Sequence, residues 1–354
     1  MNKTLLVMAG GTGGHIFPAL AVADVLRQQG WRIVWLGNPT GMEAKLVPAN
    51  GYECAWVQFG ALRGKGIMRK LLLPVTLLRA CLAARQVIKD VRPDVVLGMG
   101  GYITFPGGVM ARLAGVPLVV HEQNAVAGLA NKTLSRIATR VLTGFPDTLP
   151  EGQWVGNPVR ADIAGLPDPE ARFAARATNE PLHVLVVGGS LGAQALNQNL
   201  PKAVAQLAAS ERPVIRHQTG PRDLVAVQSA YSAIDANADV QAFINDMASA
   251  FEWADVVVCR AGALTVAELA AAGVASVLVP FPHAVDDHQR VNAEFLVRGN
   301  AGHCIIQREL TVENLAQLLR QPREQLLQQA IAARALARPE AAQTVATICE
   351  ELAA

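Results

Sequence analysis

The chain has 354 residues, of which 51% are hydrophobic and 17% charged, and its formal net charge at pH 7 is +2. This composition excludes a disordered chain and leaves room for two domains of ordinary size. Five scattered cysteines without a C-x-x-C pair, and no uncharged apolar stretch of about 18 residues, predict a reduced cytosolic protein that is neither exported nor membrane-spanning.

Short apolar runs alternate with helical patterns along the whole chain. In the first half, buried strands are predicted at residues 4–9, 32–36, 95–98, 118–121 and 140–143, with a helix at 17–29 among the helices between them. In the second half, strands are predicted at 183–187, 214–218, 256–259 and 276–279. Strands that alternate with helices form parallel sheets, so we predict an α/β fold with two doubly wound, Rossmann-like domains.

The boundary between the halves is predicted near Asn157-Pro158, because residues 165–169 have the composition of a linker. This gives a first domain at residues 1–160 and a second at 161–338. An alanine-rich helix is predicted for the tail, residues 339–354.

Each half carries a glycine-rich loop directly after its first predicted strand. Gly10-Gly11-Thr12-Gly13-Gly14-His15 is the first loop, and Gly188-Gly189-Ser190-Leu191-Gly192-Ala193 begins 178 positions later. Glycines let a backbone turn tightly, so that its N–H groups and the positive end of the next helix face an anion. The repeat at half-chain spacing predicts two nucleotide-fold domains that face one cleft.

Residues 63–92 carry eight basic side chains and a single acid, Asp90, for a net charge of +7. Pro74 is expected to start or kink a helix in this segment. Apolar residues at spacings of three and four would line one face of that helix: Ile67, Leu71, Val75, Leu78 and Leu82. Two interpretations stay open, a core-facing helix with solvated basic residues or a patch that enters the headgroups of an anionic membrane. Nucleic acid fits less well, because no aromatic residue is present for base stacking.

Polar residues gather in the loops after the predicted strands, where doubly wound sheets bind their ligands. These loops cover residues 98–102, 121–124, 259–268 and 281–289. Within the third, Glu268 lies on a helix that opens at Gly262-Ala263. It is either a solvated helix residue or a carboxylate that holds a ribose while the helix start faces a pyrophosphate.

The loop at 281–289 contains residue types that bind metals: His283, Asp286, Asp287 and His288. Such residues in one flexible loop are weak evidence for a site, so we expect neither a metal nor a cofactor.

A nicotinamide site needs an acid about 20 residues beyond the glycines, but the second strand ends in Gly37-Asn38-Pro39 and residues 214–220 contain no acid. The Walker lysine is missing from both loops. A dehydrogenase and a phosphate-hydrolysing ATPase are therefore not expected.

At these residues the chain resembles the MurG-type N-acetylglucosaminyltransferases, which convert lipid I to lipid II in bacterial peptidoglycan synthesis. The matching stretches follow the family's order over nearly the whole chain: residues 10–15, 62–66, 98–102, 121–124, 155–160, 188–190 and 259–268. The resemblance implies a GT-B fold whose last helix crosses back to the first domain. It also implies that the second domain holds UDP-N-acetylglucosamine and that the first faces the lipid-linked acceptor.

The resemblance further implies roles for individual residues. Ser190 with Gly188-Gly189 would meet the donor diphosphate, Ile244 the uracil and Glu268 the ribose. The donor pocket would be completed by Arg160, Ala263, Leu264, Thr265, Val266, Ala267 and Gln289, with Asn124 and Thr12-Gly13-Gly14 closing on the sugar. The acceptor pyrophosphate would lie against Gly13, Gly14, Gly100, Gly101 and Tyr102, and the membrane patch would consist of Leu71, Val75, Leu78 and Leu82.

The implied reaction is one displacement with inversion, in which the acceptor 4-hydroxyl attacks the anomeric carbon of an α-linked donor and forms a β-1,4 bond. Backbone N–H groups, a helix dipole and arginines can stabilise the departing UDP without a metal. His15 is the candidate base, because an imidazole titrates near neutrality and this one lies beside the expected acceptor loop. Its alternative role is to brace the glycine loop. Glu122 is the second candidate base.

Two other functions are weighed against this one. A UDP-sugar epimerase of the same build would share the donor site but has no use for a membrane-docking surface, and a non-catalytic sensor would bind UDP-N-acetylglucosamine without turnover. The partners expected from the resemblance are UDP-N-acetylglucosamine, lipid I, an anionic membrane surface and the cell-wall and division machinery. The expected location is peripheral, on the cytoplasmic face of the bacterial inner membrane.

Overall fold

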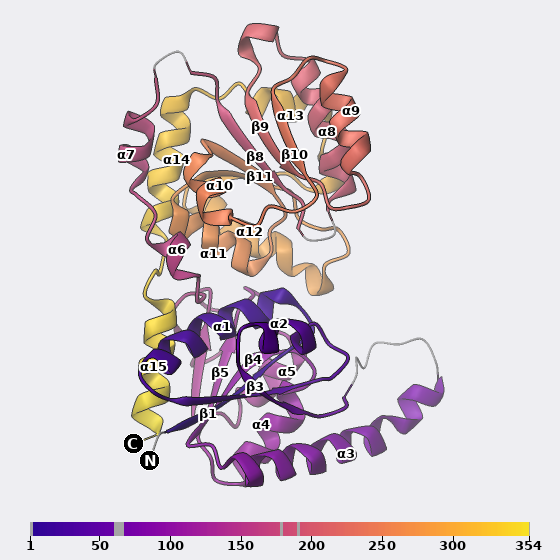
Figure 1. The fold of residues 1–354 in the computed structure, drawn as a ribbon, viewed down its shortest axis with the longest axis vertical. Coiled ribbons are helices and arrows are strands. Elements are labelled where there is room, and N and C mark those ends of the chain that lie inside the picture. The colour runs from indigo at the N-terminus through magenta and orange to yellow at the C-terminus, as the bar shows by residue number, and fades with distance from the viewer. Residues whose placement is uncertain (1–2, 60–66, 178–179, 190–191, 354) are drawn as a thin grey trace. The chain divides into compact units, whose positions relative to one another are not determined.

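The computed structural model describes residues 3–59, 67–177, 180–189 and 192–353, and leaves the side chains of 67–72 undescribed. The chain divides into two compact units, residues 1–160 with 338–354, and residues 161–337. Each unit contains one parallel sheet with helices packed against it (Figure 1). The prediction of an α/β fold with two parallel, doubly wound sheets is therefore confirmed.

Within the described residues, the first unit has a seven-stranded sheet in the order β3-β2-β1-β4-β5-β6-β7. Its strands are β1 (Thr4–Ala9), β2 (Arg32–Gly37), β3 (Glu53–Trp56), β4 (Val95–Gly100), β5 (Leu118–Glu122), β6 (Arg140–Thr143) and β7 (Gln153–Trp154). Its helices are α1 (Gly13–Gln28), α2 (Glu43–Ala49), α3 (Ile67–Val91), α4 (Thr104–Leu113), α5 (Leu129–Leu134) and α15 (Ala341–Leu352). The tail helix α15 packs against α1, and Val345 and Ile348 join the same core as Ile16.

The described part of the second unit has a six-stranded sheet in the order β10-β9-β8-β11-β12-β13. Its strands are β8 (His183–Val187), β9 (Val214–Gln218), β10 (Ala238–Gln241), β11 (Val256–Cys259), β12 (Ala275–Leu278) and β13 (Gly302–Cys304). Its helices are α6 (Ala161–Ala164), α7 (Pro169–Ala174), α8 (Gln194–Ala205), α9 (Leu224–Ser232), α10 (Met247–Trp253), α11 (Ala263–Ala272), α12 (His288–Arg298), α13 (Val312–Leu318) and α14 (Arg323–Ala335). Three short 3₁₀ turns lie at Ala209–Glu211, Val285–Asp287 and Gln307–Glu309.

The central strands are apolar without interruption because both of their faces are buried. On β1, Leu5 and Val7 pack into the core on one face of the sheet, and Leu6 and Met8 pack into the core on the other. Such strands show a continuous apolar run rather than alternation. The predicted bounds of β1 agree with the structure, whereas β12 begins and ends one residue earlier than predicted.

The strands that the sequence did not predict are the outermost ones, β3 and β7 in the first sheet and β10 and β13 in the second. An edge strand has a neighbour on one side only, so fewer of its residues are buried. Val240 is the single buried residue of β10, and none of the three residues of β13 is buried. The four edge strands therefore could not be predicted from the pattern of apolar residues.

Helix α1 begins at Gly13, four residues before the predicted start at residue 17. The prediction treated Gly13 and Gly14 as loop residues because glycines let a backbone turn tightly. In the structure these glycines form the first turn of α1, and the glycine loop proper is shorter, Gly10 to Thr12. The N–H groups of this first helical turn therefore lie at the end of β1.

The apolar stripe of α3 is exposed where its side chains are described. Val75, Leu78 and Leu82 are 48%, 61% and 55% exposed. The opposite side of the helix, with Ala80 and Ile88, joins the core shared with α4. The core-facing interpretation of the stripe is therefore wrong for these three residues. Pro74 lies inside α3 rather than at its start, and the side chain of Leu71 is outside the described residues.

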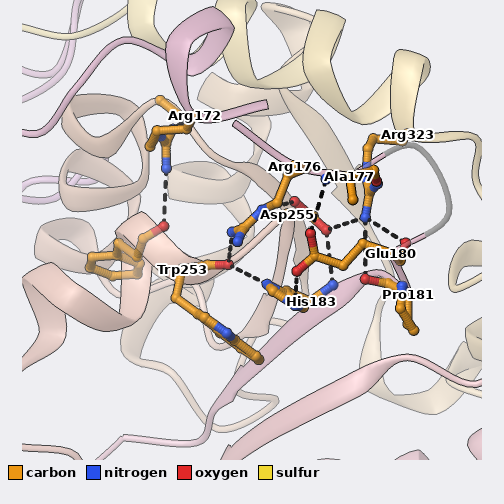
Figure 2. Close-up of polar contacts among 11 residues, drawn as sticks. Arg172, Arg176, Ala177, Glu180, Pro181, His183, Trp253, Asp255 and Arg323 are labelled. Carbon is orange, nitrogen blue, oxygen red and sulfur yellow. Dashed lines mark hydrogen bonds and ion pairs between the residues drawn. The ribbon is translucent and has the colours of Figure 1, made fainter. Parts of the chain in front are cut away.

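A buried polar cluster joins the starts of β8 and β11 in the second unit (Figure 2). Asp255 accepts a hydrogen bond from the His183 backbone N–H at 2.9 Å, and its carboxylate lies 3.5 Å from Arg176 Nε and 3.3 Å from Arg323 Nη2. The ring of His183 stacks on Trp253 with centroids 4.5 Å apart, and burial together with Arg176 lowers the pKa of this histidine. The cluster lies at the amino ends of the strands, away from the edge where such sheets bind ligands, so we interpret it as structural.

Replacing Asp255 with alanine is expected to destabilise the protein by about 3 kcal/mol, because two largely buried arginines lose their counter-ion. Urea unfolding measures this change. Glu309→Ala is the matched control, since it removes an exposed partner of Arg308, and it should change the stability by less than about 1 kcal/mol. Equal losses in the two variants would show that the cluster contributes no more than a surface ion pair.

Candidate functional site

The strand order of each sheet reverses next to its glycine loop. In the first unit β1 lies between β2 and β4, and in the second β8 lies between β9 and β11. Open α/β sheets bind their ligands at the carboxyl ends of the strands at this point. The candidate residues are therefore those in the loops after β1 and β4, and those in the loops after β8 and β11.

His15 lies in the first turn of α1, beside the loop after β1. Its Nδ1 is 3.1 Å from the Gly10 carbonyl oxygen and 3.4 Å from Thr12 Oγ1. A carbonyl oxygen can only accept, so this contact assigns the proton of the neutral ring to Nδ1. Nε2 then carries the lone pair that a general base needs, on a ring that is only half-buried.

The loop after β4 packs directly on this glycine loop. Gly10 N–H donates to the Gly100 carbonyl at 3.3 Å, and a Cβ on Gly100 would lie 2.9 Å from His15 Cδ2. Gly100 and Gly101 have φ angles of +108° and +91°, which favour glycine. Tyr102, which follows them, is 38% exposed. The structure thus brings together the two loops in which the resemblance placed an acceptor pyrophosphate.

Glu122, the second candidate base, is buried, and both oxygens of its carboxylate accept hydrogen bonds. Its side chain is 1% exposed and accepts hydrogen bonds from the Asn124 and Gly128 backbone N–H groups at 2.9 and 3.1 Å. The side-chain amides of Asn124 and Asn131 donate to it as well, at 3.3 and 2.9 Å. A carboxylate held by four N–H donors is placed to shape the loop around Asn124 rather than to meet a substrate hydroxyl.

His121 and Gln123 tie β5 to the loop that leads to Arg160. His121 Nε2 donates to the Gly156 carbonyl at 2.9 Å, and Gln123 Nε2 donates to His121 Nδ1 at 3.1 Å. Burial lowers the pKa of His121 to about 4, so the ring stays neutral near pH 7. Asn157 closes the network by donating to the Gln123 carbonyl at 3.0 Å. Arg160 follows this loop and is half-buried.

In the second unit, Gln218 at the end of β9 connects the glycine loop to Ile244. Its Nε2 donates to the Gly189 carbonyl at 3.0 Å, and its Oε1 accepts from the Ile244 backbone N–H at 3.0 Å. Gly192 has a φ angle of +79°, and a Cβ there would overlap the carbonyl oxygen of Thr219. The glycine loop is therefore packed closely against the loop after β9. Ser190 lies outside the described residues.

Helix α11 starts directly after the loop that follows β11, with Gly262 as its N-cap. Ala263 and Val266 are 7% and 0% exposed, so Val266 faces the core. The half-buried residues of its first turns are Leu264, Thr265, Ala267 and Glu268. The positive end of this ten-residue helix lies at the carboxyl edge of the sheet, which favours a negatively charged ligand there.

Arg260 and Gln289 make hydrogen bonds that link neighbouring loops. Arg260 Nη1 donates to the Val279 carbonyl at 3.0 Å and Nη2 to Gln307 Oε1 at 2.7 Å, and burial lowers the pKa of this guanidinium. Gln289 Oε1 accepts from the Ala261 and Phe281 backbone N–H groups at 3.3 and 2.9 Å. Both side chains therefore shape the loops after β11 and β12.

Two features are absent from the part of the chain that the structure describes. It contains no group of three or more His, Cys, Asp or Glu side chains that could hold a metal ion. Among the same residues, no helix is both long enough and apolar enough to cross a membrane.

Comparison with known proteins gives the family. Residues 5–143 match the glycosyltransferase family 28 N-terminal domain, and residues 183–348 match the glycosyltransferase family 28 C-terminal domain. The chain belongs to glycosyltransferase family 28. The family resemblance stated from the motifs is confirmed, and this chain is a glycosyltransferase.

Two relatives resemble this family 28 enzyme over its full length. They are the UDP-N-acetylglucosamine--N-acetylmuramyl-(pentapeptide) pyrophosphoryl-undecaprenol N-acetylglucosamine transferases of Dechloromonas aromatica and Aromatoleum aromaticum. The first is 60% identical over 100% of both chains, and the second is 61% identical over 99% of this chain and 98% of the relative. A crystal structure of MurG from Acinetobacter baumannii covers 99% of each chain with a TM-score of 0.88 and 44% identity.

Two residues that organise the candidate site of this family 28 enzyme were not predicted from the sequence. Gln218 joins two loops of the second unit, and the buried Glu43 accepts a hydrogen bond from the Gly11 backbone N–H at 3.0 Å. Glu43 lies six positions after the end of β2, beyond the strand end where a nicotinamide site would have its acid. An acid two positions after Gly41 and close to the end of a predicted strand was the feature of the sequence that could have pointed to it.

Proposed function

We propose that this enzyme transfers N-acetylglucosamine from UDP-N-acetylglucosamine to the 4-hydroxyl of the muramyl sugar of lipid I and so forms lipid II. The observation that carries the proposal is the 60% identity, over the full length of both chains, to a transferase whose name gives this donor and this acceptor. Nothing in the comparisons favours an epimerase or a non-catalytic sensor.

The second unit is the donor-binding half in this proposal. Its glycine loop with Ser190 and the start of α11 would receive the UDP diphosphate, because backbone N–H groups and a helix N-terminus favour an anion. Ile244, fixed by Gln218, would meet the uracil, and Glu268 the ribose. Arg160, Asn124, Gln289 and residues 263–267 complete the donor contacts, with Val266 contributing through its backbone because its side chain is buried.

The first unit is the acceptor-binding half. Gly13, Gly14, Gly100, Gly101 and Tyr102 would hold the acceptor pyrophosphate, with Thr12 next to the transferred sugar. His15 Nε2 takes the proton of the 4-hydroxyl as that oxygen bonds to the anomeric carbon and the bond from this carbon to the UDP oxygen breaks. The α-linked donor sugar becomes β-linked, and backbone N–H groups stabilise the charge on UDP.

The deciding experiment supplies UDP-N-acetylglucosamine with a lipid I analogue and analyses the lipid and nucleotide products by mass spectrometry. We expect a β-1,4-linked disaccharide lipid and one UDP for each disaccharide. Free UDP-N-acetylmannosamine without a disaccharide would replace the proposal with an epimerase, and donor binding without any product would replace it with a sensor.

We further propose that the enzyme docks peripherally on an anionic membrane at the cytoplasmic face of the inner membrane. Its substrate carries a lipid, and α3 supports the proposal with an exposed apolar face at Val75, Leu78 and Leu82. Arg79, Arg85 and Lys89 on the same helix are exposed and positively charged. Apolar insertion and attraction to anionic headgroups add in affinity. Leu71 belongs to the proposed patch by its spacing, and cell-wall and division proteins remain proposed partners.

Replacing Val75, Leu78 and Leu82 together with serine is expected to lower the fraction of protein that floats with anionic liposomes by about tenfold, because three apolar side chains no longer insert. Flotation on a density gradient measures this fraction. Val225→Ser changes a residue on α9 of the second unit that is 73% exposed, more than any of the three, and this variant should float like the unaltered protein. Undiminished flotation of the triple variant would exclude this face as the docking surface.

A further inference from the structure

A buried carboxylate, that of Glu43, lies against the glycine loop of the first unit. The side chain is 1% exposed, although glutamate is seldom buried this completely. Its Oε2 accepts from the Gly11 backbone N–H at 3.0 Å, and its Oε1 accepts from the Asn38 backbone N–H at 3.0 Å. Because both oxygens accept from N–H donors, the contacts fit an ionised carboxylate. Glu43 is also the first residue of α2, where the helix dipole favours a negative charge.

Glycines leave the space that this carboxylate fills. A Cβ on Gly10 would lie 2.5 Å from Glu43 Oε1, and a Cβ on Gly37 would lie 2.9 Å from Glu43 Cγ. A Cβ on Gly41 would overlap the carboxylate as well. The three positions come from the ends of β1 and β2 and from the turn before α2. Side chains at these positions would displace the carboxylate from the loop.

The carboxylate and His15 are joined by a single peptide group. The N–H of Gly11 and the C=O of Gly10 belong to the same peptide, which donates to Glu43 on one side and accepts from His15 Nδ1 at 3.1 Å on the other. Hydrogen bonds in such a chain polarise one another. A negative charge at the N–H end therefore makes the Gly10 carbonyl a stronger acceptor for His15.

The hydrogen-bonded path from Glu43 to His15 opposes the effect of the α1 N-terminus on this histidine. His15 lies in the first turn of α1, and the positive end of a helix disfavours a positively charged imidazole. A base that accepts the proton of a hydroxyl becomes positively charged. A strong acceptor at Nδ1 stabilises that charge, and in the neutral ring it holds the proton on Nδ1, so that Nε2 carries the lone pair.

We propose that Glu43 is a positioning residue, which acts through the Gly10–Gly11 peptide to hold His15 with Nδ1 protonated and Nε2 available, and to stabilise the imidazolium that forms in the reaction. The inference rests on the proposed function in one respect, since it assumes that His15 takes the proton of the acceptor hydroxyl. Glu43 itself does not touch the substrates in this proposal.

The test combines a double-mutant cycle with a spectroscopic measurement. Glu43→Gln is expected to lower kcat for disaccharide formation by about tenfold, the effect of one lost hydrogen bond to a charged group, with the KM for UDP-N-acetylglucosamine changed less than about twofold. In a His15→Ala background the same change should cause no further loss, because Glu43 acts through His15. Glu53→Gln, which alters an exposed ion pair of β3, is the matched control and should leave kcat unchanged.

The ring tautomer of His15 is read in the free protein from ¹H–¹⁵N correlation spectra of ¹⁵N-histidine-labelled samples. The unaltered protein should show Nδ1 protonated, and Glu43→Gln should shift the ring toward the Nε2-protonated form. If the losses of kcat from Glu43→Gln and His15→Ala multiply in the double variant, Glu43 acts independently of His15, and the proposal is overturned. A ring protonated at Nε2 in the unaltered protein would overturn it without any variant. Failure of the proposed function would appear differently, as unaltered protein that forms no disaccharide whatever its tautomer.

Discussion

His15→Ala is expected to lower kcat for disaccharide formation by about a hundredfold or more, the usual contribution of a general base. Its Nδ1 is bound to the Gly10 carbonyl, which leaves Nε2 as the proton acceptor. The variant should still bind UDP-N-acetylglucosamine, because the donor is assigned chiefly to the second unit. Steady-state kinetics with a lipid I analogue and calorimetric titration with the donor measure the two quantities.

Glu122→Gln is the comparison that separates the two candidate bases. Glu122 is buried and accepts from four N–H donors, so its replacement should lower the melting temperature and disturb the loop around Asn124. A selective loss of kcat in Glu122→Gln without a change in melting temperature, together with an active His15→Ala variant, would transfer the role of base to Glu122.

Gly192→Ala is expected to weaken the binding of UDP-N-acetylglucosamine by at least about tenfold and to lower the unfolding free energy by about 3 kcal/mol or more. The residue has a φ angle of +79°, and the added Cβ would overlap the backbone carbonyl of Thr219. A backbone group cannot rotate away as a flexible side chain can, so the glycine loop or the loop after β9 has to move. Calorimetric titration and urea unfolding measure the two effects.

Gly189→Ala in the same loop is the matched control for stability. Its φ angle is +84°, but nothing lies within 4 Å of the added Cβ. Only the conformational cost of about 1–2 kcal/mol applies there. Equal destabilisation by the two variants would mean that the close approach of Gly192 to Thr219 contributes nothing to the stability of the loop.

The candidate site could be predicted from the sequence wherever a residue type and a short spacing define the chemistry. The glycine loops, His15 beside the first of them and Glu268 two turns into a helix after β11 are of this kind. Glu43 and Gln218 could not be found in this way. Each acts on a backbone group that is distant in the chain, 32 positions away between Glu43 and Gly11 and 29 between Gln218 and Gly189.

The direction in which a side chain points was also beyond reach of the sequence. Glu122 was a plausible base by residue type, but the turn after β5 directs the backbone N–H groups of Asn124 and Gly128 to its carboxylate. The apolar spacing of α3 was compatible with a core-facing or an exposed stripe. Contact with α4 resolves this ambiguity, because Ala80 and Ile88 occupy the buried side and leave Leu78 and Leu82 exposed.

The sequence alone determined the α/β class and the central strands, because a strand buried on both faces needs a continuous apolar run whatever surrounds it. It also determined where the two glycine loops begin, because glycine is the residue that favours the positive φ angles of Gly11, Gly189 and Gly192. The tertiary structure decided the edge strands, the exposure of α3, the burial of Glu122 and the path from Glu43 through the Gly10–Gly11 peptide to His15. These features depend on contacts between segments that are distant in the chain, and the spacing of residues within one segment does not predict such contacts.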